Sequence, residues 1–157
     1  MRVVSRNKCF VCDRIRLIND CKNKYFVKEM ESGYVVLCDF QYFEGYTIFL
    51  SKTHTNELHK LKDTERSLFL EEMAIVAEAV INAFHPKKLN YELLGNSDSH
   101  IHWHLIPRYR NDPKPETAIW AIDYSERCHE KYKPSDRKLK QMKKKLLFQL
   151  NKLVQDH

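Results

Sequence analysis

Residues 100–107 read H-I-H-W-H-L-I-P, and this stretch decides both the fold and the site of the chain. In a β-strand alternate side chains point to the same face of the sheet, so histidines occupy one face and apolar residues the other. The two sets are His100, His102 and His104 against Ile101, Trp103 and Leu105. Buried imidazoles need polar partners, so this pattern indicates a metal site, a nucleophile with an acid–base group, or both. A solvated histidine-rich edge strand is the alternative, but it does not explain the apolar residues in between.

Three further segments accompany the triad. Cys9-Phe10-Val11-Cys12 is a C-x-x-C motif, Gly33 to Asp39 reads as a strand, and Gly45 to His54 reads as a strand that ends in a histidine. Together with the triad they resemble the histidine-triad (HIT) superfamily of nucleotide hydrolases and transferases, from residue 8 to residue 110. The C-x-x-C resembles that of a zinc-containing branch, which includes bacterial HIT proteins similar to diadenosine tetraphosphate hydrolases.

Length and composition favour one domain. The 157 residues are enough to bury a substantial core, and no apolar run approaches the length of a membrane span. The N-terminus lacks the apolar middle of a secretory signal, and the five cysteines suggest a reducing compartment instead of a disulfide framework. We therefore expect a cytoplasmic protein with no membrane partner.

The hydrophobic pattern predicts an α+β fold with a five-stranded, meandering antiparallel sheet and one long central helix, as the HIT resemblance also implies. The helix is expected from Asp63, its N-cap, to Phe84, ahead of Pro86. Its predicted apolar stripe is Leu70, Met73, Ala74, Ala77, Val80, Ile81 and Phe84. The predicted strands are 24–30, 33–39, 46–51, 89–94 and 101–108, with a helical turn at 56–61.

Residues 1–110 are interpreted as the HIT-like nucleotide-binding domain and 111–157 as a C-terminal extension packed on it. An irregular segment (111–133) leads to an amphipathic helix with Ser135 as N-cap and the apolar residues Leu139, Met142, Leu146, Leu150 and Leu153. From residue 135 onward the chain carries seven Lys or Arg and two Asp, which is +5 of the total charge of +6. Nucleic acid or another anionic partner is compatible with this face, but a solvated basic face is favoured because no aromatic residues alternate with the lysines.

The C-x-x-C supplies two thiolates for a tetrahedral zinc, which requires two more nitrogen or sulfur ligands. Cys21 and Cys38 together would complete a four-cysteine site, although Cys38 lies in an apolar strand. The resemblance implies instead that His54 and His100 are the remaining ligands. A site made of Cys9, Cys12, His54 and His100 has no open position, so its Zn²⁺ would be structural. His59 is a weaker substitute for His54, and two reduced cysteines in a turn are the alternative to any metal site.

The resemblance assigns the catalytic roles to the other two histidines. It implies that His102 attacks the α-phosphorus of a nucleotide and forms a nucleotidyl-histidine, because a neutral imidazole is a competent nucleophile near pH 7. His104 is placed to donate to a phosphoryl oxygen as negative charge builds. A half-buried, satisfied histidine is the alternative for His104.

Substrate contacts are predicted on either side of the histidines. Asp39 matches the family's acidic residue that accepts from ribose hydroxyls, although an Asp that closes a strand also forms turns. The turn 95–99 offers Asn96, Ser97 and Ser99 to the leaving group. This turn is shorter than the glycine-rich loop of better-known branches, and Tyr46 stands where those branches carry a histidine.

Two functions of different classes follow. The first is a nucleotide hydrolase or nucleotidyl transferase that acts on dinucleoside polyphosphates or nucleoside phosphoramidates. The second is a zinc-stabilised nucleotide- or partner-binding module with weak or vestigial catalysis, which Tyr46 and the short turn favour. A catalytic metal held by all three triad histidines is a third possibility that leaves the C-x-x-C without a purpose. The family resemblance also implies a homodimer formed through the central helix and a sheet edge.

Overall fold

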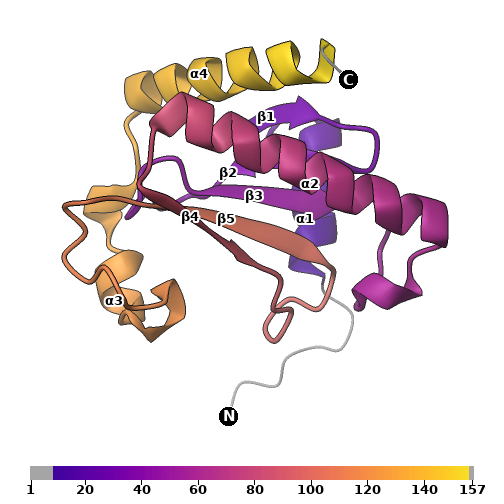
Figure 1. The fold of residues 1–157 in the computed structure, drawn as a ribbon, viewed down its shortest axis with the longest axis horizontal. Coiled ribbons are helices and arrows are strands. Elements are labelled where there is room, and N and C mark those ends of the chain that lie inside the picture. Colours follow the sequence, from indigo (N-terminus) through magenta and orange to yellow (C-terminus); the bar gives the residue numbers. More distant parts are fainter. Residues whose placement is uncertain (1–8, 156–157) are drawn as a thin grey trace.

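The computed structural model describes residues 9–155 and has the expected α+β architecture, a five-stranded antiparallel sheet with helices on both faces (Figure 1). The elements in chain order are α1 (Phe10–Asn19), β1 (Phe26–Glu29), β2 (Gly33–Leu37), β3 (Thr47–Ser51), the 3-10 turn η1 (Leu58–Lys60), α2 (Asp63–Phe84), β4 (Lys88–Glu92), β5 (His102–Arg108), the 3-10 turn η2 (Ile119–Ala121), α3 (Tyr124–Arg127), the 3-10 turn η3 (Glu130–Tyr132) and α4 (Asp136–Gln155). Within the described residues no helix is both long enough and apolar enough to cross a membrane.

The strand order β1-β2-β3-β5-β4 is a meander that is interrupted once. The first three strands pair in sequence, α2 then carries the chain across the sheet, and β5 pairs with β3 while β4 forms the edge. In the β3–β5 register, Leu50 lies opposite His102 and Ile48 lies opposite His104. This register places the triad strand in the interior of the sheet, which excludes the edge-strand interpretation of the histidines.

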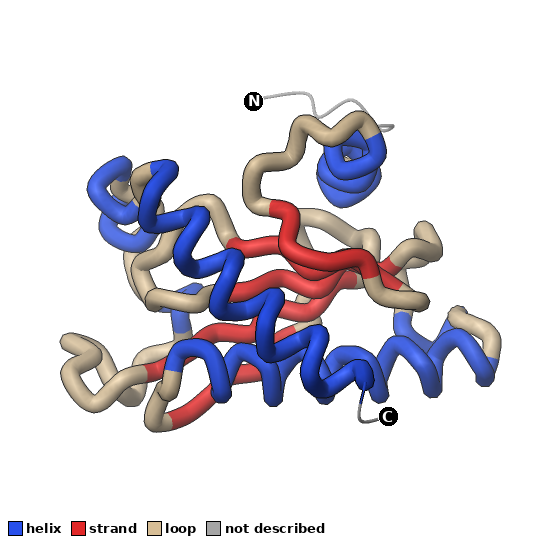
Figure 2. Tube along the Cα trace, turned by 90° about the horizontal axis from the view of Figure 1, so that it is seen from above, coloured by secondary structure: helices blue, strands red, loops and turns tan. Residues whose placement is uncertain are grey.

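The alternation of β5 separates two apolar clusters on the two faces of the sheet. Leu105, Ile101 and Trp103 face the main core under α2, in which Phe49 stacks on Phe69 with ring centroids 5.1 Å apart. The even-numbered positions of β5 face the other side, where α1 packs over β2 and β3. Seen from above, the strands lie between α1 and α2 (Figure 2).

The central helix has the predicted length, but two details of the prediction are wrong. Lys62 is the N-cap and makes no capping bond with its side chain, whereas Asp63 is the first helical residue and accepts from Arg66 at 2.7 Å. The buried positions are Phe69, Glu72, Val76, Ala77, Ala79, Val80, Ala83 and Phe84, so that Ala74 and Ile81 of the predicted stripe are exposed. The buried arc is rotated and widened because the helix contacts both the sheet and α4.

The C-terminal helix packs against α2 and β1, on the face of the sheet opposite the triad histidines (Figure 1). Its first amides are capped by Ser135, whose hydroxyl accepts from the Lys138 N–H at 3.3 Å. The residues of its stripe that are buried against α2 and β1 are Leu139, Met142, Leu146 and Leu150, and Leu153 is partly buried. Its lysines are mostly exposed.

The N-terminal segment differs from the sequence prediction, which described the C-x-x-C as a tight turn. Cys9 is instead the N-cap of α1, and its Sγ accepts from the Cys12 N–H at 3.3 Å. Val11 and Ile18 are buried against Val36 and other residues of the sheet. The apolar spacing of these residues is helical, but only two residues of the helix are fully buried, which makes its pattern weak in the sequence.

Candidate metal site and active site

Four side chains of the described residues meet as a compact group of metal-ligating atoms: Cys9, Cys12, His54 and His100. Their ligand atoms all lie within 4.8 Å of one another. The Nδ1 atom of His100 is 3.4 Å from Cys9 Sγ, 3.5 Å from Cys12 Sγ and 3.2 Å from His54 Nδ1. These separations are close to the edges, about 3.3–3.8 Å long, of the tetrahedron that zinc–nitrogen and zinc–sulfur bonds define.

The orientation of His100 also fits a metal ligand. Its Nε2 lies 2.9 Å from the carbonyl oxygen of Ser51, so Nε2 carries the proton and Nδ1 presents its lone pair to the cluster. Burial and the neighbouring Cys9 raise the pKa of the Cys12 thiol to about 11, which a divalent cation at this position would reverse. The four donor atoms, with the Ser51 carbonyl fixing the orientation of His100, therefore fit Zn²⁺.

The other candidate ligands lie outside this cluster. Cys38 is packed with Tyr46 and Ile106, and burial raises its thiol pKa to about 12. Cys21 is exposed, and His59 belongs to η1. His102 and His104 are likewise not members, so a metal held by all three triad histidines does not match the arrangement of the described residues.

Beside the cluster, a pocket of about 360 Å³ opens over the face of the sheet that carries the triad. The pocket floor consists of Ile48, Leu50, His102 and His104 from β3 and β5. The α1 wall consists of Phe10, Val11 and Arg14. The C-terminal wall consists of Ile119, Trp120, Tyr124, Arg127 and Cys128. Asp39, Tyr46 and Asp98 also line the pocket.

His102 has a fixed tautomer. Its Nδ1 lies 2.7 Å from the carbonyl oxygen of His100, and a carbonyl only accepts, so Nδ1 carries the proton. The lone pair of the imidazole is therefore on Nε2. The side chain is 8% exposed and lines the pocket, so its second nitrogen is available to a ligand there.

His104 is paired with Tyr46. Tyr46 directly precedes β3 and His104 lies on the neighbouring strand β5, and Tyr46 Oη is 2.7 Å from His104 Nδ1. Burial lowers the pKa of His104 to about 3, with smaller contributions from His102 and Arg127, and burial raises the pKa of Tyr46 well above its ordinary value. Both groups are therefore neutral near pH 7, and a hydroxyl that donates to Nδ1 leaves the His104 proton on Nε2.

Asp39, the residue predicted to bind ribose hydroxyls, is paired with an arginine that the sequence analysis did not identify. Asp39 lines the pocket, and its Oδ1 is 2.6 Å from the guanidinium of Arg14. Arg14 also lies over the Phe10 ring, with 5.0 Å between the guanidinium carbon and the ring centroid. Because α1 also carries two of the four clustered ligands, the metal site and this end of the pocket share one element.

The turn before the triad contributes differently from what the sequence suggested. Asn96, Ser97 and Ser99 are exposed and are not among the residues lining the pocket, whereas Asp98 is. Gly95 has a φ of 80°, a conformation that favours glycine and sets the entry to the turn. A contact of Asn96, Ser97 or Ser99 with a leaving group stays a prediction.

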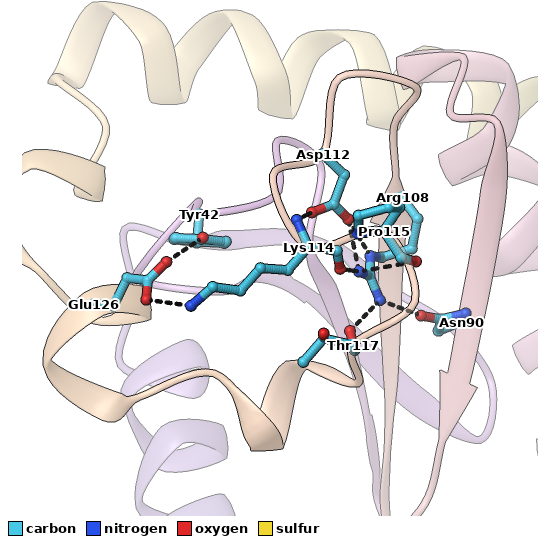
Figure 3. A network of polar contacts seen from close by, with 8 residues as sticks. All are labelled: Tyr42, Asn90, Arg108, Asp112, Lys114, Pro115, Thr117 and Glu126. Carbon is cyan, nitrogen blue, oxygen red and sulfur yellow. Dashed lines mark hydrogen bonds and ion pairs between the residues drawn. The ribbon is translucent and has the colours of Figure 1, made fainter.

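The C-terminal wall is held by a polar network (Figure 3). Arg108, at the end of β5, pairs with Asp112 at 2.6 Å and donates to the carbonyl oxygens of Lys114 and Thr117. Glu126 accepts from the hydroxyl of Tyr42 and from the ammonium of Lys114, both at 2.7 Å. The sequence pointed to an irregular segment here but gave no signal that it reaches the histidines.

The C-terminal wall touches the histidine pair through its tryptophan. The rings of Trp120 and His104 meet edge to face, with centroids 5.1 Å apart, and His104 meets His102 in the same manner at 4.6 Å. The indole N–H of Trp120 donates to Glu92 on β4. These contacts join the segment that follows β5 to the triad histidines and to β4.

A fold and a pocket of this kind define a histidine-triad protein, and comparisons with known proteins agree. The HIT domain family model matches residues 22–111. Since this match spans more than half of the chain, the chain belongs to the HIT domain family. It is 29% identical over 98 residues to "Protein hit" of Bacillus subtilis, a match that covers 59% of this chain and 63% of that protein. The chain thus spans less than two thirds of the length of that relative.

Solved structures show the same fold. A histidine triad protein of Bradyrhizobium japonicum superposes with a TM-score of 0.71 at 15% identity, covering 80% of this chain and 89% of that one. A Zn-bound histidine triad family protein of Mycobacterium smegmatis gives a TM-score of 0.59 at 18% identity, with 94% and 99% covered. At these identities the likeness concerns the fold.

Proposed function

We propose that this chain is a nucleotide hydrolase or nucleotidyl transferase. Its reaction cleaves a dinucleoside polyphosphate or nucleoside phosphoramidate at the α-phosphate through a covalent nucleotidyl-His102. The observation that carries the proposal is the hydrogen bond of His102 Nδ1 to the His100 carbonyl, because it leaves the Nε2 lone pair free within the pocket. Membership of the HIT family supports nucleotide chemistry of this general type.

The reaction has two displacements. His102 Nε2 attacks the α-phosphorus, and the bond from phosphorus to the bridging oxygen or nitrogen breaks, with its electron pair leaving on the departing group. Water or another acceptor then attacks the same phosphorus, and the P–N bond to His102 breaks and restores the imidazole. The neutral His104 donates from Nε2 to a phosphoryl oxygen in both steps, where negative charge develops.

Substrate placement follows the pocket lining. Asp39 keeps one carboxylate oxygen for a ribose hydroxyl while Arg14 binds the other. A leaving group that extends past Asp98 would meet Asn96, Ser97 and Ser99 at its outer end, so these three are proposed as leaving-group contacts. The free state of all five cysteines, which lie within the described residues, is compatible with a reducing cytoplasm.

We assign Zn²⁺ to Cys9, Cys12, His54 and His100 as a structural metal. With four protein ligands the site has no open position for substrate, so it would supply stability and would hold α1 against β5. We further propose a homodimer that pairs through α2 and the β4 edge. Three exposed apolar side chains, Ile81, Tyr91 and Leu94, support that surface, and a monomer in sedimentation at micromolar concentration would refute it.

Trapping the intermediate tests the function. Wild type and His102→Ala are incubated with a nucleoside phosphoramidate and a dinucleoside tetraphosphate, each radiolabelled at the α-phosphate, and are quenched in alkaline denaturant. The expected result is label on wild type alone, with turnover in the variant reduced by about 10⁴-fold or more. Reversible nucleotide binding by wild type without label would instead select a zinc-stabilised binding module.

A further inference from the structure

The C-terminal wall presents a cation to the pocket without an acidic partner. The Arg127 guanidinium carbon lies 4.9 Å from the ring centroid of Trp120 and 5.3 Å from that of Tyr124. Its Nε donates to the Ile122 carbonyl at 3.3 Å, and one terminal nitrogen contacts the Cys128 sulfur at 3.6 Å. Among residues 9–155, no carboxylate oxygen lies within 4.0 Å of this guanidinium.

The arginine of the opposite wall is different. Arg14 is 2.6 Å from Asp39, so its charge is compensated inside the protein. Both arginines lie over aromatic rings, but only Arg127 keeps an uncompensated positive charge in the described pocket. Contact with the Trp120 and Tyr124 rings also restricts the Arg127 side chain, so less conformational entropy is lost when the guanidinium binds an anion.

The position of this cation relative to the histidines is defined by contacts. Trp120 touches the His104 ring, and the positive charge of Arg127 contributes to the lowered pKa of that imidazole. His104 in turn contacts His102. The guanidinium of Arg127 is therefore connected to the proposed nucleophile His102 by two intervening rings, those of Trp120 and His104.

The segment that carries Arg127 is fixed to the rest of the protein. The neighbouring Glu126 is bound to Tyr42 and Lys114, and the Asp123 carboxylate caps α3 by accepting from the Ser125 N–H at 2.8 Å. A side chain at position 127 is thus presented to the pocket by a short helix with anchors of its own. Replacement of the guanidinium removes none of these anchors.

We propose that Arg127 is a phosphate-binding residue of the nucleotide site, supplied by the C-terminal extension beyond the family-matched residues 22–111. Its ligand is the phosphate that His102 attacks, on the His104 side. A guanidinium forms paired charge-assisted hydrogen bonds with phosphate oxygens, which a nucleoside without phosphate does not offer. This inference rests on the proposed function.

Calorimetric titration of the full chain with matched ligands separates phosphate recognition from nucleoside recognition. AMP and adenosine, and GMP and guanosine, are titrated into wild type, Arg127→Met and Arg127→Lys. Arg137→Met is the control, since Arg137 is an exposed arginine on α4 across the sheet. For the base that binds, Arg127→Met should weaken the monophosphate about tenfold and leave the nucleoside unchanged. Arg127→Lys should lie between, and Arg137→Met should match wild type.

The other outcomes overturn the inference in distinguishable ways. Equal monophosphate affinity in wild type and Arg127→Met shows that the guanidinium does not bind phosphate and leaves the proposed function standing. A parallel loss for monophosphate and nucleoside shows that Arg127 only supports the pocket. Wild type that binds neither monophosphate overturns the proposed function, and this inference with it.

Discussion

The pocket floor and the two pocket walls belong to different parts of the molecule and are held by different forces. The floor lies within the family-matched residues, and its histidines are each less than 10% exposed in paired strands above the main core. The walls are contributed by residues before and after that match, and their aromatic residues Phe10, Trp120 and Tyr124 are 52%, 40% and 68% exposed. The proposed reacting groups are thus placed by the core, whereas the walls of the pocket belong to segments outside the family match.

The wall segments 10–14 and 119–128 have few fully buried apolar side chains of their own. The α1 wall is attached through the Cys9 and Cys12 ligands, the Arg14–Asp39 ion pair and the packing of Val11. The C-terminal wall is attached through the network around Arg108 and Glu126, and through Ile119 and Ile122, which are buried in one cluster with Ile106 of β5. We therefore expect floor changes to alter global stability, and wall changes to alter the metal, the ligand or the local protection of the backbone.

The largest difference in the free energy of unfolding should be between alanine variants of a floor phenylalanine and a wall phenylalanine. Phe49 is fully buried beneath the floor and stacked on Phe69, so Phe49→Ala should lower the free energy of unfolding by about 3–5 kcal/mol. Phe10 is half exposed, so Phe10→Ala should change it by less than about 0.5 kcal/mol. Urea denaturation of both variants measures the contrast, and similar losses would contradict the division between floor and walls.

Loss of the proposed metal ligands Cys9 and Cys12 should destabilise the α1 wall. The double variant Cys9→Ser with Cys12→Ser should bind no zinc and lose at least about 2 kcal/mol, a part of the ~10–16 kcal/mol available from structural zinc binding. Hydrogen exchange should show that the amides of α1 lose protection while those of β5 keep it. Cys21→Ser, which changes an exposed cysteine outside the cluster, is the control. Zinc content that is unchanged in the double variant would refute the site.

The floor was predictable from the sequence because its signal is local. Alternation in residues 100–105 determined which side chains share a face, and His54, which follows β3, completed the cluster of four metal-ligating side chains. The family resemblance, more than spacing, selected His54 over Cys38. The length of α2 was also predictable, but its buried face was not, because α4 covers a second side that periodicity alone does not reveal.

The walls were not predictable because their contacts join residues far apart in the chain. Arg14 meets Asp39 across 25 positions, and Tyr42 meets Glu126 across 84. Segment 111–133 has neither helical nor strand periodicity, so nothing local indicates that Trp120 and Arg127 reach the pocket. Tyr46 was noticed only as a departure from the family pattern, and its pairing with His104 required the structure.

The folding stability should depend on pH because the floor contains the buried imidazole of His104. Burial lowers the pKa of His104 to about 3, whereas the unfolded imidazole keeps its ordinary value of 6.5. Between these values the unfolded state binds a proton that the folded state does not, so stability falls as the pH decreases from 6.5. From pH 7 to pH 5 we expect His104 to account for roughly 1–2 kcal/mol of lost stability. His104→Gln should show a flatter dependence in denaturation at the two pH values, and parallel curves would contradict this.

Removing the hydroxyl of Tyr46 should test whether this group fixes the tautomer of His104. Tyr46→Phe removes the group next to His104 Nδ1 and allows the proton to occupy either nitrogen, so kcat should fall about tenfold with little change in KM. Tyr109→Phe, which loses a hydrogen bond to the Glu44 carbonyl at 2.5 Å, is the matched control and should keep full activity. Unchanged kcat in Tyr46→Phe would show that the tyrosine only fills space.

The smallest effect on kcat/KM should come from the lysines of α4, a helix that belongs to neither the floor nor the walls. Lys143, Lys144 and Lys145 lie on α4, across the sheet from the pocket, and fields from exposed charges are screened within about 8–10 Å at physiological salt. Replacing all three with Gln should therefore change kcat/KM for a dinucleoside tetraphosphate by less than about twofold at physiological salt. A substantial fall at low salt that disappears at high salt would instead show that this face attracts the substrate. Arg127→Met, whose guanidinium touches the wall beside His104, should keep its defect at both salt concentrations.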